Sequence, residues 1–296
     1  MNNNVKQKIN RILVPVDFSG YSLNACYFAM HLASRTGAGL RLFHAFFNPM
    51  IDAMAFPDAF TYQSNMAEIF RELEENSKKE MKKFAKKLNK YAKIKDLKEV
   101  KVETGVVAGQ PGEEIESIIG TYDPDFIVIG TRGHGERANE VLGSVAARVI
   151  DISGIPVLLV TRDAKLREEG DVRLLYATDF DDTDYQAIGS LSAIMSGYRL
   201  NIFCVHFETG PAKEDKEGKM AEMKNKLIEN EKVMSIECHN IRSDDIVTDL
   251  NRFVEANDIE LIALTHKKRN IFYRLFNPSL AKKLLFQTKK PVFVFN

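Results

Sequence analysis

Short apolar runs alternate, in the first half of the chain, with longer segments in which apolar residues recur at helical spacing. The runs cover residues 12–16, 40–45, 100–107, 126–129 and 156–160. Continuous apolar runs of this length are typical of strands buried on both faces of a sheet. The pattern therefore predicts five parallel strands alternating with helices, which is the doubly wound α/β class.

Two of the predicted helices carry recognisable signals. Ser19 precedes Leu23 and Tyr27, which share one helical face, so its hydroxyl is placed to cap that helix. Gly37 follows the same segment and can adopt the left-handed conformation that ends many helices. A long amphipathic helix is predicted around residues 69–91, before the third strand.

The second half of the chain repeats the first. Asp17 and His44 return as Asp179 and His206, both at a shift of 162 residues. The later strands match at a shift of 135, so the second copy is about 27 residues shorter in its middle.

This repeat predicts two tandem domains of the same fold. We expect them to cover residues 1–165 and 166–296. The charged segment 162–170, which ends in a glycine, is the predicted linker.

Composition excludes several classes of function. The 41 Lys and Arg balance the 41 Asp and Glu, so no bulk charge attracts nucleic acid or a membrane surface. No run approaches the ~18 apolar residues of a membrane helix, and the first residues are polar, unlike a signal peptide. We therefore expect a cytoplasmic protein that binds neither nucleic acid nor membrane.

The cysteines and histidines do not predict a metal site. Cys26, Cys204 and Cys238 are an odd number without CxxC spacing, so we expect three buried, hydrophobic side chains. The six histidines show no HxH or HExxH spacing, and no protein-held metal is expected.

Candidate chemistry lies where the predicted strands end, because ligands bind at the carboxyl ends of strands in such sheets. Glycines at these ends let a backbone approach a ligand closely, and the start of the following helix offers N–H groups to an anion. The combination predicts a phosphate cradle. The residues at these ends are Asp17, His44, Ala45, Gly130, Gly133, Gly143 and Ser144.

Other phosphate motifs fit this loop less well. The chain has no GxxxxGK[ST] sequence, which disfavours the P-loop NTPases. A GxGxxA spacing beginning at Gly133 follows the fourth strand, whereas the dinucleotide fingerprint follows the first. Taken singly, Asp17 is also typical of a helix cap and His44 of a packed histidine.

Together these features resemble the universal stress proteins in their tandem form. The resemblance rests on residues 14–19, 44–45, 109–115 and 155–160, and on the pattern Gly130-x2-Gly133-x9-Gly143-Ser144. That glycine pattern is similar to the one in the ATP-binding branch of the family. The resemblance implies two domains like the adenine-nucleotide alpha-hydrolases. It also implies that their last strands, 156–160 and 291–295, pair to give an intramolecular pseudo-dimer.

The same resemblance implies an adenine nucleotide, ATP, in the first copy. Asp17 and Ala45 would lie near the adenine, and the glycines and Ser144 around the ribose and phosphates, with Arg132 and His134 beside the phosphates. Mg²⁺ or Mn²⁺ would be held through the phosphates and not by a protein cage. The implied site consists of Pro15, Val16, Asp17, Ala45, Ile129, Gly130, Thr131, Arg132, Gly133, Gly143, Ser144 and Val145.

The second copy departs from this pattern. Side chains replace the glycines, and a proline removes a backbone donor. Of the four cradle positions only Ser144 is retained, and Asp17 also keeps its carboxylate as Asp179; we predict that the second copy binds no ATP. The counterparts are Thr265 for Gly130, Lys268 for Gly133, Pro278 for Gly143, Ser279 for Ser144 and Phe207 for Ala45.

These inferences favour a stress-response or signalling switch that binds ATP and acts through contacts with an unidentified protein partner. A slow ATPase or phosphotransferase and a pairing scaffold without nucleotide stay open, and no catalytic residue is assigned. The sequence leaves undecided whether the chain forms a homodimer and what residues 47–65 do. Residues 261–296 hold eight Lys or Arg and no Asp or Glu, which fits an anion-binding face or a solvated one.

Overall fold

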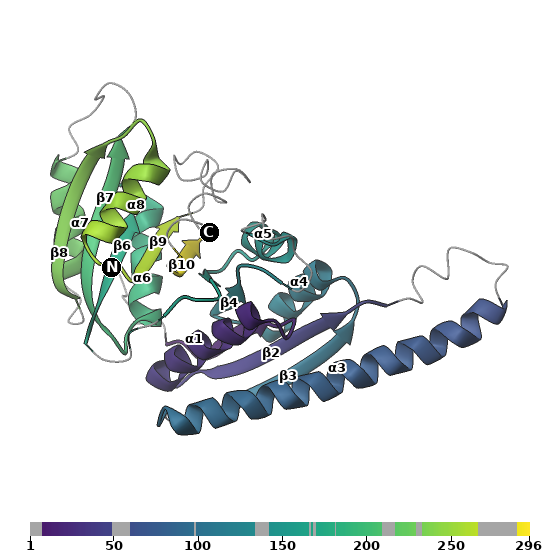
Figure 1. Ribbon diagram of the computed structural model, residues 1–296. Helices are drawn as coiled ribbons and strands as arrows, with labels where there is room; N and C mark the ends of the chain where they lie inside the picture. The colour runs from purple at the N-terminus through teal and green to yellow at the C-terminus, as the bar shows by residue number, and fades with distance from the viewer. Residues whose placement is uncertain are drawn as a thin grey trace.

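The computed structural model describes residues 8–48, 60–97, 99–133, 142–165, 167, 170–180, 182–208, 217–228, 233–265 and 289–296. Within them, ten strands form one continuous sheet with helices on both faces (Figure 1). The order is β3-β2-β1-β4-β5-β10-β9-β6-β7-β8. Each half of the sheet has the strand order 3-2-1-4-5 counted within its own copy, as the predicted doubly wound class requires.

The first copy contributes five strands and four helices among the described residues. Its strands are β1 (Arg11–Pro15), β2 (Gly39–Phe46), β3 (Val102–Ala108), β4 (Phe126–Gly130) and β5 (Val157–Val160). Its helices are α1 (Gly20–Thr36), α3 (Phe60–Ile94), α4 (Pro111–Tyr122) and α5 (Ser144–Ile152).

The second copy contributes five strands and, in its described part, three helices. Its strands are β6 (Asp171–Ala177), β7 (Arg199–Glu208), β8 (Val233–Arg242), β9 (Leu261–Thr265) and β10 (Val292–Phe295). Its helices are α6 (Asp182–Ile194), α7 (Glu217–Ile228) and α8 (Ile246–Ala256).

The two copies join through their last strands, as the resemblance implied. All strand pairs are parallel except β5 with β10, where Leu158 lies opposite Phe293 in an antiparallel ladder. Asn296 then donates from Nδ2 to the carbonyl oxygen of Ile150 at 3.0 Å and to the hydroxyl of Ser153 at 2.9 Å. The chain is therefore an intramolecular pseudo-dimer with one sheet running through it.

Backbone geometry repeats between the copies. Phe18 and its counterpart Phe180 both adopt positive φ, at 63° and 60°. Asp123 and Asp258, which match at the second shift, do so at 51° and 49°. Residues other than glycine seldom adopt this conformation, and a phenylalanine especially so, so its recurrence supports the common origin of the two halves.

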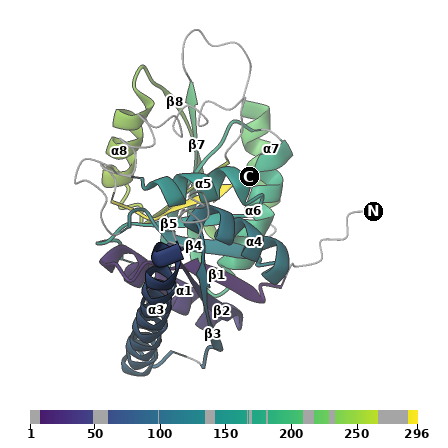
Figure 2. The ribbon, with the colours of Figure 1, turned by 90° about the vertical axis from the view of Figure 1, so that its right-hand side faces the viewer.

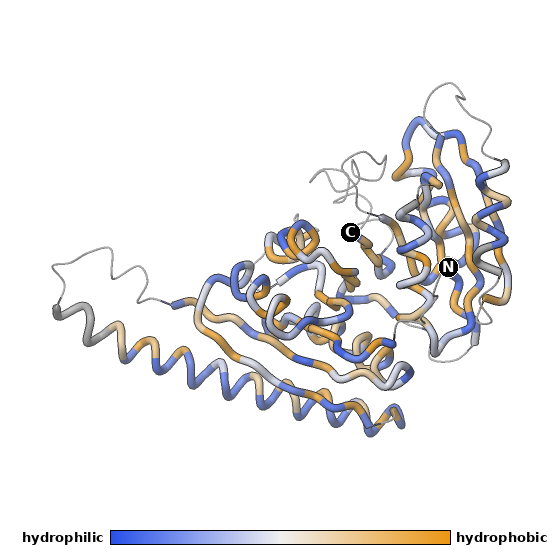
Figure 3. Tube along the Cα trace, turned by 180° about the vertical axis from the view of Figure 1, so that it is seen from behind, coloured by the Kyte–Doolittle hydropathy of each residue, from blue (hydrophilic) through white to orange (hydrophobic). Residues whose placement is uncertain are grey.

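Two apolar layers cover the two faces of the sheet (Figures 1 and 2). One layer packs α1, α3, α6 and α7 against it, and the other packs α4, α5 and α8. Both layers continue from one copy into the other. Figure 3 shows the apolar strands between helices that turn hydrophilic faces outward.

Local sequence explains the limits of α1. The Ser19 hydroxyl accepts a hydrogen bond from the backbone N–H of Ser22 at 3.2 Å, as a helix N-cap does. Gly37 ends the helix at φ 78°, and its N–H donates to the carbonyl oxygen of Ala33. Both predicted helix ends are thus confirmed.

The long helix predicted before the third strand is α3, and its first turns extend past the carboxyl end of β2 (Figure 1). It packs through the buried Met81, Phe84 and Leu88, spaced as one helical face. No described helix is both long enough and apolar enough to span a membrane. Of residues 47–65, those from 49 to 59 lie outside the described part of the chain.

One expectation about the cysteines is wrong. Cys26 and Cys204 are buried, but Cys238 is partly exposed. Its strand, β8, is the last in the sheet and has a neighbour on one side only. An edge position leaves more of the side chain open to solvent than a central strand does.

Candidate functional site

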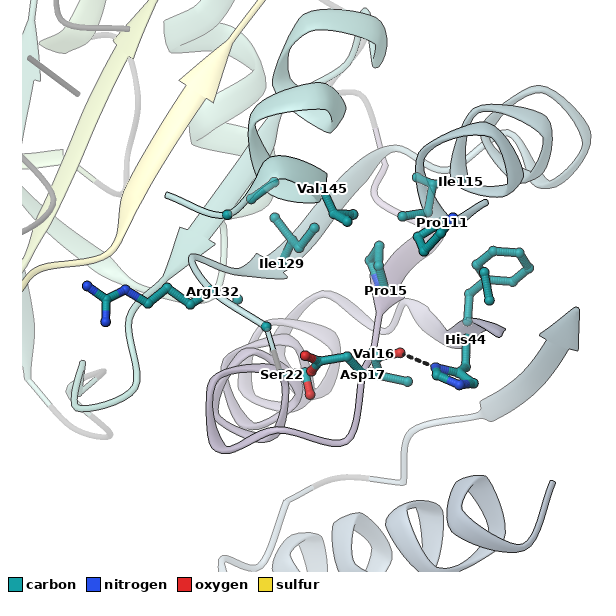
Figure 4. Close-up of a pocket in the computed structure, with 16 residues that line it drawn as sticks. Pro15, Val16, Asp17, Ser22, His44, Pro111, Ile115, Ile129, Arg132 and Val145 are labelled. Atoms are coloured by element: carbon teal, nitrogen blue, oxygen red, sulfur yellow. Dashed lines mark hydrogen bonds between the residues drawn. The ribbon is translucent and has the colours of Figure 1, made fainter. Parts of the chain in front are cut away.

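A cavity of about 110 Å³ opens at the carboxyl ends of β1, β2 and β4, beside the first turns of α4 and α5 (Figure 4). This is the edge where ligands bind in doubly wound sheets. Apolar side chains make up most of the wall. The lining residues are Pro15, Val16, Asp17, Ser22, Phe43, His44, Ala45, Pro111, Ile115, Ile129, Gly130, Arg132, Gly133, Gly143, Val145 and Ala146.

Ten of the twelve predicted site residues line this cavity, and Thr131 and Ser144 do not. Thr131 is buried, with its N–H donating to the carbonyl oxygen of Val160 at 3.0 Å, while its own carbonyl accepts from the N–H of Gly143 at 2.7 Å. These two hydrogen bonds tie the loop between β4 and α5 to β5. Ser144 is exposed at the start of α5, and His134 lies outside the described residues.

His44 stiffens the side of the cavity formed by β1 and β2. Its Nδ1 lies 2.7 Å from the carbonyl oxygen of Val16, the contact drawn as a dashed line in Figure 4. Its ring lies 4.4 Å from that of Phe18, measured between centroids. Burial lowers the pKa of His44, which favours the neutral ring. A neutral imidazole has one N–H, and in His44 this group pairs with the carbonyl oxygen of Val16. The ring therefore positions the backbone of Val16 at the cavity.

Asp17 faces the glycine loop. Its Oδ1 accepts a hydrogen bond from the N–H of Ser19 at 3.1 Å, which ties the carboxylate to the start of α1. A Cβ placed on Gly133 would lie only 2.7 Å from Asp17 Oδ2. Glycine at this position therefore leaves room for the carboxylate at the edge of the cavity.

Gly130 has a different reason to be glycine. A Cβ there would lie 2.9 Å from the carbonyl carbon and the Cβ of Tyr21, and 3.1 Å from the N of Ser22. These atoms belong to the first turn of α1, which cannot move as a flexible side chain does. Gly130 lets α1 pack closely on β4, so its first role is structural.

The start of α5 supplies polar groups to the cavity. Gly143 is the N-cap, and a helix start leaves its first N–H groups without partners inside the helix. The only cation among the described lining residues is Arg132, whose guanidinium lies 5.9 Å from the ring centroid of Tyr21. In Figure 4 that guanidinium points away from the other labelled side chains.

Sequence reasoning did not assign Ser22, Phe43, Pro111, Ile115 and Ala146 to the site. Four of the five are apolar residues that a sequence cannot distinguish from core residues. The one available signal was the Gly-Gln-Pro-Gly turn at 109–112, which places Pro111 at the first position of α4. His44 was noted at its strand end, but its partner Val16 could not be foreseen.

In the second copy a buried polar cluster occupies the equivalent place. Asp184, the counterpart of Ser22, is fully buried. Its carboxylate accepts hydrogen bonds from Thr178 Oγ1 at 2.6 Å, Thr265 Oγ1 at 3.0 Å and Tyr176 Oη at 3.1 Å. The backbone N–H of Asp179 adds a fourth, at 3.1 Å. We call these five residues the Asp184 cluster.

Two further features of the second copy match the first copy or depart from it. His206 repeats the His44 contact, with Nδ1 2.8 Å from the carbonyl oxygen of Thr178. Phe207, in the place of Ala45, is fully buried. The other replaced positions, Lys268, Pro278 and Ser279, lie outside the described residues. No group of three or more potential metal-ligating side chains occurs in the part of either copy that the structure describes.

Comparison with known proteins gives consistent matches. The model of the universal stress protein family matches residues 8–161. The chain is similar to universal stress protein YxiE of Bacillus subtilis, with 30% identity over 152 residues, which are 51% of this chain and 98% of that protein. A universal stress protein from Archaeoglobus fulgidus shares the fold over 99% of this chain and 97% of its own, with a TM-score of 0.66 and 20% identity. A universal stress protein solved in complex with cAMP covers 53% of this chain and 100% of its own, at 20% identity and a TM-score of 0.36.

Proposed function

Because the chain belongs to the universal stress protein family, we propose that its first copy binds an adenine nucleotide, ATP, in the cavity at the ends of β1, β2 and β4. The observation that supports this most directly is the arrangement of the cavity. An apolar wall, one carboxylate and a helix start meet in it, and these are the kinds of group that bind a base, a ribose and a phosphate chain.

The adenine fits the apolar end. Pro15, Val16, Ala45 and Ile115 provide a narrow surface for a flat ring, and His44 holds the Val16 backbone in place. A carboxylate accepts hydrogen bonds and donates none, so Asp17 suits the hydroxyls of the ribose or the amino group of the base.

The triphosphate fits beside the start of α5. The N–H groups at the start of α5 and the positive end of its dipole favour an anion beside Gly143. Gly133 permits the backbone to approach the phosphates without a side chain between them. A Mg²⁺ or Mn²⁺ ion would be held through the phosphate oxygens, because the described lining residues offer one carboxylate only, Asp17.

We further propose one nucleotide per chain. This proposal is supported by the buried, hydrogen-bonded Asp184 and Thr265 and the buried Phe207, which stand in the second copy at the positions of Ser22, Gly130 and Ala45. The second copy then serves as the pairing partner, and occupancy of the first copy changes the surface offered to another protein. The limits of the two domains, 1–165 and 166–296, are part of this proposal.

Hydrolysis is not the expected role. Phosphoryl transfer needs a positioned base or water and cationic stabilisation at the γ-phosphate. Among the described lining residues, the neutral His44 is engaged with Val16, and the Arg132 guanidinium points away. We therefore expect binding with little or no turnover.

Calorimetric titration of nucleotide-free protein with ATP and Mg²⁺ tests the proposal, with a phosphate-release assay on the same sample. We expect one ATP per chain and no release above background. Gly133→Ala should weaken binding at least several-fold, since the new methyl group displaces the Asp17 carboxylate. Gly120→Ala is the matched control, because a Cβ at Gly120 meets nothing within 4 Å.

The outcomes separate the alternatives. If millimolar ATP, ADP and AMP all gave no heat of binding, the proposal of nucleotide binding would be refuted, and a pairing scaffold without nucleotide would be favoured. Two nucleotides per chain would contradict the filled second copy. Turnover that Gly133→Ala abolishes would favour the ATPase.

A further inference from the structure

Two cysteines of the second copy lie side by side at the edge of the sheet. Cys204 on β7 and Cys238 on β8 are register partners in a parallel ladder, so their side chains point to the same face. Both pack in the apolar layer under α7, beside Met220 and Met223. Residues paired across parallel strands lie about 4.8 Å apart, inside the roughly 4.4–6.8 Å between Cα atoms that a disulfide spans.

The two thiols have unlike environments. Cys204 is fully buried, whereas Cys238 is partly exposed, and the Cys238 Sγ lies 3.9 Å from the carbonyl oxygen of Met220. The hydrogen bond from Cys204, helped by the Lys224 ammonium and opposed by burial, lowers the pKa of Cys238 to about 7. The same hydrogen bond and burial raise the pKa of Cys204 well above its ordinary value. One thiol is thus accessible and easily ionised, and its neighbour stays protonated.

We propose that Cys204 and Cys238 form an oxidation site, in which hydrogen peroxide or a related hydroperoxide converts the pair into an intramolecular disulfide. Nothing in this inference depends on nucleotide binding. The disulfide would bond the edge strand β8 covalently to β7.

The chemistry balances with peroxide as the oxidant. The Cys238 thiolate attacks one peroxide oxygen, the O–O bond breaks, and the sulfur becomes a sulfenic acid while hydroxide leaves. The Cys204 sulfur then attacks the Cys238 sulfur, the S–O bond breaks, and the departing hydroxide takes the Cys204 proton. Two thiols and one peroxide give one disulfide and two waters.

Cys238 should react first. The thiolate is the nucleophile, and at neutral pH an ordinary cysteine of pKa about 8.5 is only a few per cent ionised. Cys26 provides the internal control, because it is fully buried on the same face and burial alone strongly raises the pKa of its thiol. Only one of these three cysteines is therefore both exposed and ionised.

The test treats the reduced, folded, full-length protein with hydrogen peroxide, quenches it by alkylation in denaturant, and maps the peptides without reduction. We expect the oxidised protein to carry two alkyl groups fewer than the untreated protein, with one linked pair of peptides containing Cys204 and Cys238, and Cys26 fully alkylated. The link should form at least several-fold faster in folded protein than in urea, because unfolding separates the two strands.

Two variants check the order of events. Cys204→Ala should stop the reaction at a Cys238 sulfenic acid, which dimedone traps, and Cys238→Ala should leave Cys204 unreacted. A link to Cys26, a disulfide between chains, or a Cys204–Cys238 link that forms only in urea would overturn the proposal. Because the peptide mapping uses the unsubstituted chain, its result holds even if a variant fails to fold.

Discussion

Replacing Asp184 by alanine should destabilise the second copy much more than a surface substitution does. The Asp184 carboxylate is the common acceptor of the cluster, and Thr178, Tyr176 and Thr265 around it are essentially inaccessible to water. Burial and the nearby Asp184 raise the pKa of Tyr176, so its phenol is protonated and donates. Removing the carboxylate takes one acceptor away from each of these donors.

The cost follows from counting those donors. Tyr176 can still donate to the backbone carbonyl oxygen of residue 184, which lies 3.3 Å away, and Thr265 can donate to Tyr176 at 3.0 Å. The Thr178 hydroxyl loses its acceptor, whereas Asp179 is half-buried and its N–H can reach water. A buried donor left unsatisfied costs about 1–3 kcal/mol, so the free energy of unfolding should fall by about that amount. Against a typical total of about 5–15 kcal/mol, this is a substantial loss.

Urea unfolding followed by far-UV circular dichroism measures the effect, since the chain has no Trp for fluorescence. Asp184→Asn keeps the shape and removes the charge, and should lose less than alanine does. Asp244→Ala removes an exposed carboxylate and should change the free energy of unfolding by no more than about 0.5 kcal/mol. If Asp184→Ala matched Asp244→Ala, the cluster would not stabilise the fold and our account of it would be refuted.

Three further predictions concern the first copy. Gly130→Ala should lower the free energy of unfolding by about 1–3 kcal/mol, because its methyl group would overlap the backbone of Tyr21; an unchanged urea midpoint would contradict this. Ser19→Ala should cost about 1 kcal/mol in the same assay through loss of the α1 cap, whereas Ser19→Asp should cost little. The folded-state pKa of His44 is lowered, so the unfolded chain binds the proton first. The free energy of unfolding should therefore rise with pH in the window below about 6.5, the ordinary pKa of histidine. His44→Asn should remove this part of the pH dependence. Urea midpoints measured from about pH 5 to 7.5 would test both statements.

Local chemistry is sufficient to predict much of the first copy. Ser19 and Gly37 are the residues that the two ends of α1 require, so the limits of that helix follow from the sequence. The strand ends, with Asp17 and Gly133, also follow, because periodicity places each strand within a few residues. The pairing of β5 with β10 required the resemblance to a known family, since nothing in two short apolar strands specifies an antiparallel partner so distant along the chain.

What could not be predicted depends on three-dimensional packing. The exposure of Cys238 depends on β8 being the edge strand, and strand order in a parallel sheet is not written in the strands themselves. Ile115 reaches the cavity because α4 packs beside α5, and its side chain resembles any core isoleucine in the sequence. The alignment of Ser22 with Asp184 follows from the repeat, but the burial of that carboxylate does not.

The two copies differ at a pair of neighbouring positions, Gly130 and Ser22 in the first copy and Thr265 and Asp184 in the second. In the first copy Gly130 is bare, so α1 lies against β4 and the small Ser22 borders an open cavity. In the second copy Thr265 replaces the glycine and puts a hydroxyl in the interior, which is costly unless an acceptor is present. Asp184, in the place of Ser22, is that acceptor at 3.0 Å. Thr265 also lies 3.0 Å from the Tyr176 hydroxyl, and Asp184 also accepts from Tyr176 and Thr178, so both replacements are stabilised by the cluster as a whole. Reversing either one would break a hydrogen bond in this buried network, and we expect it to destabilise the second copy.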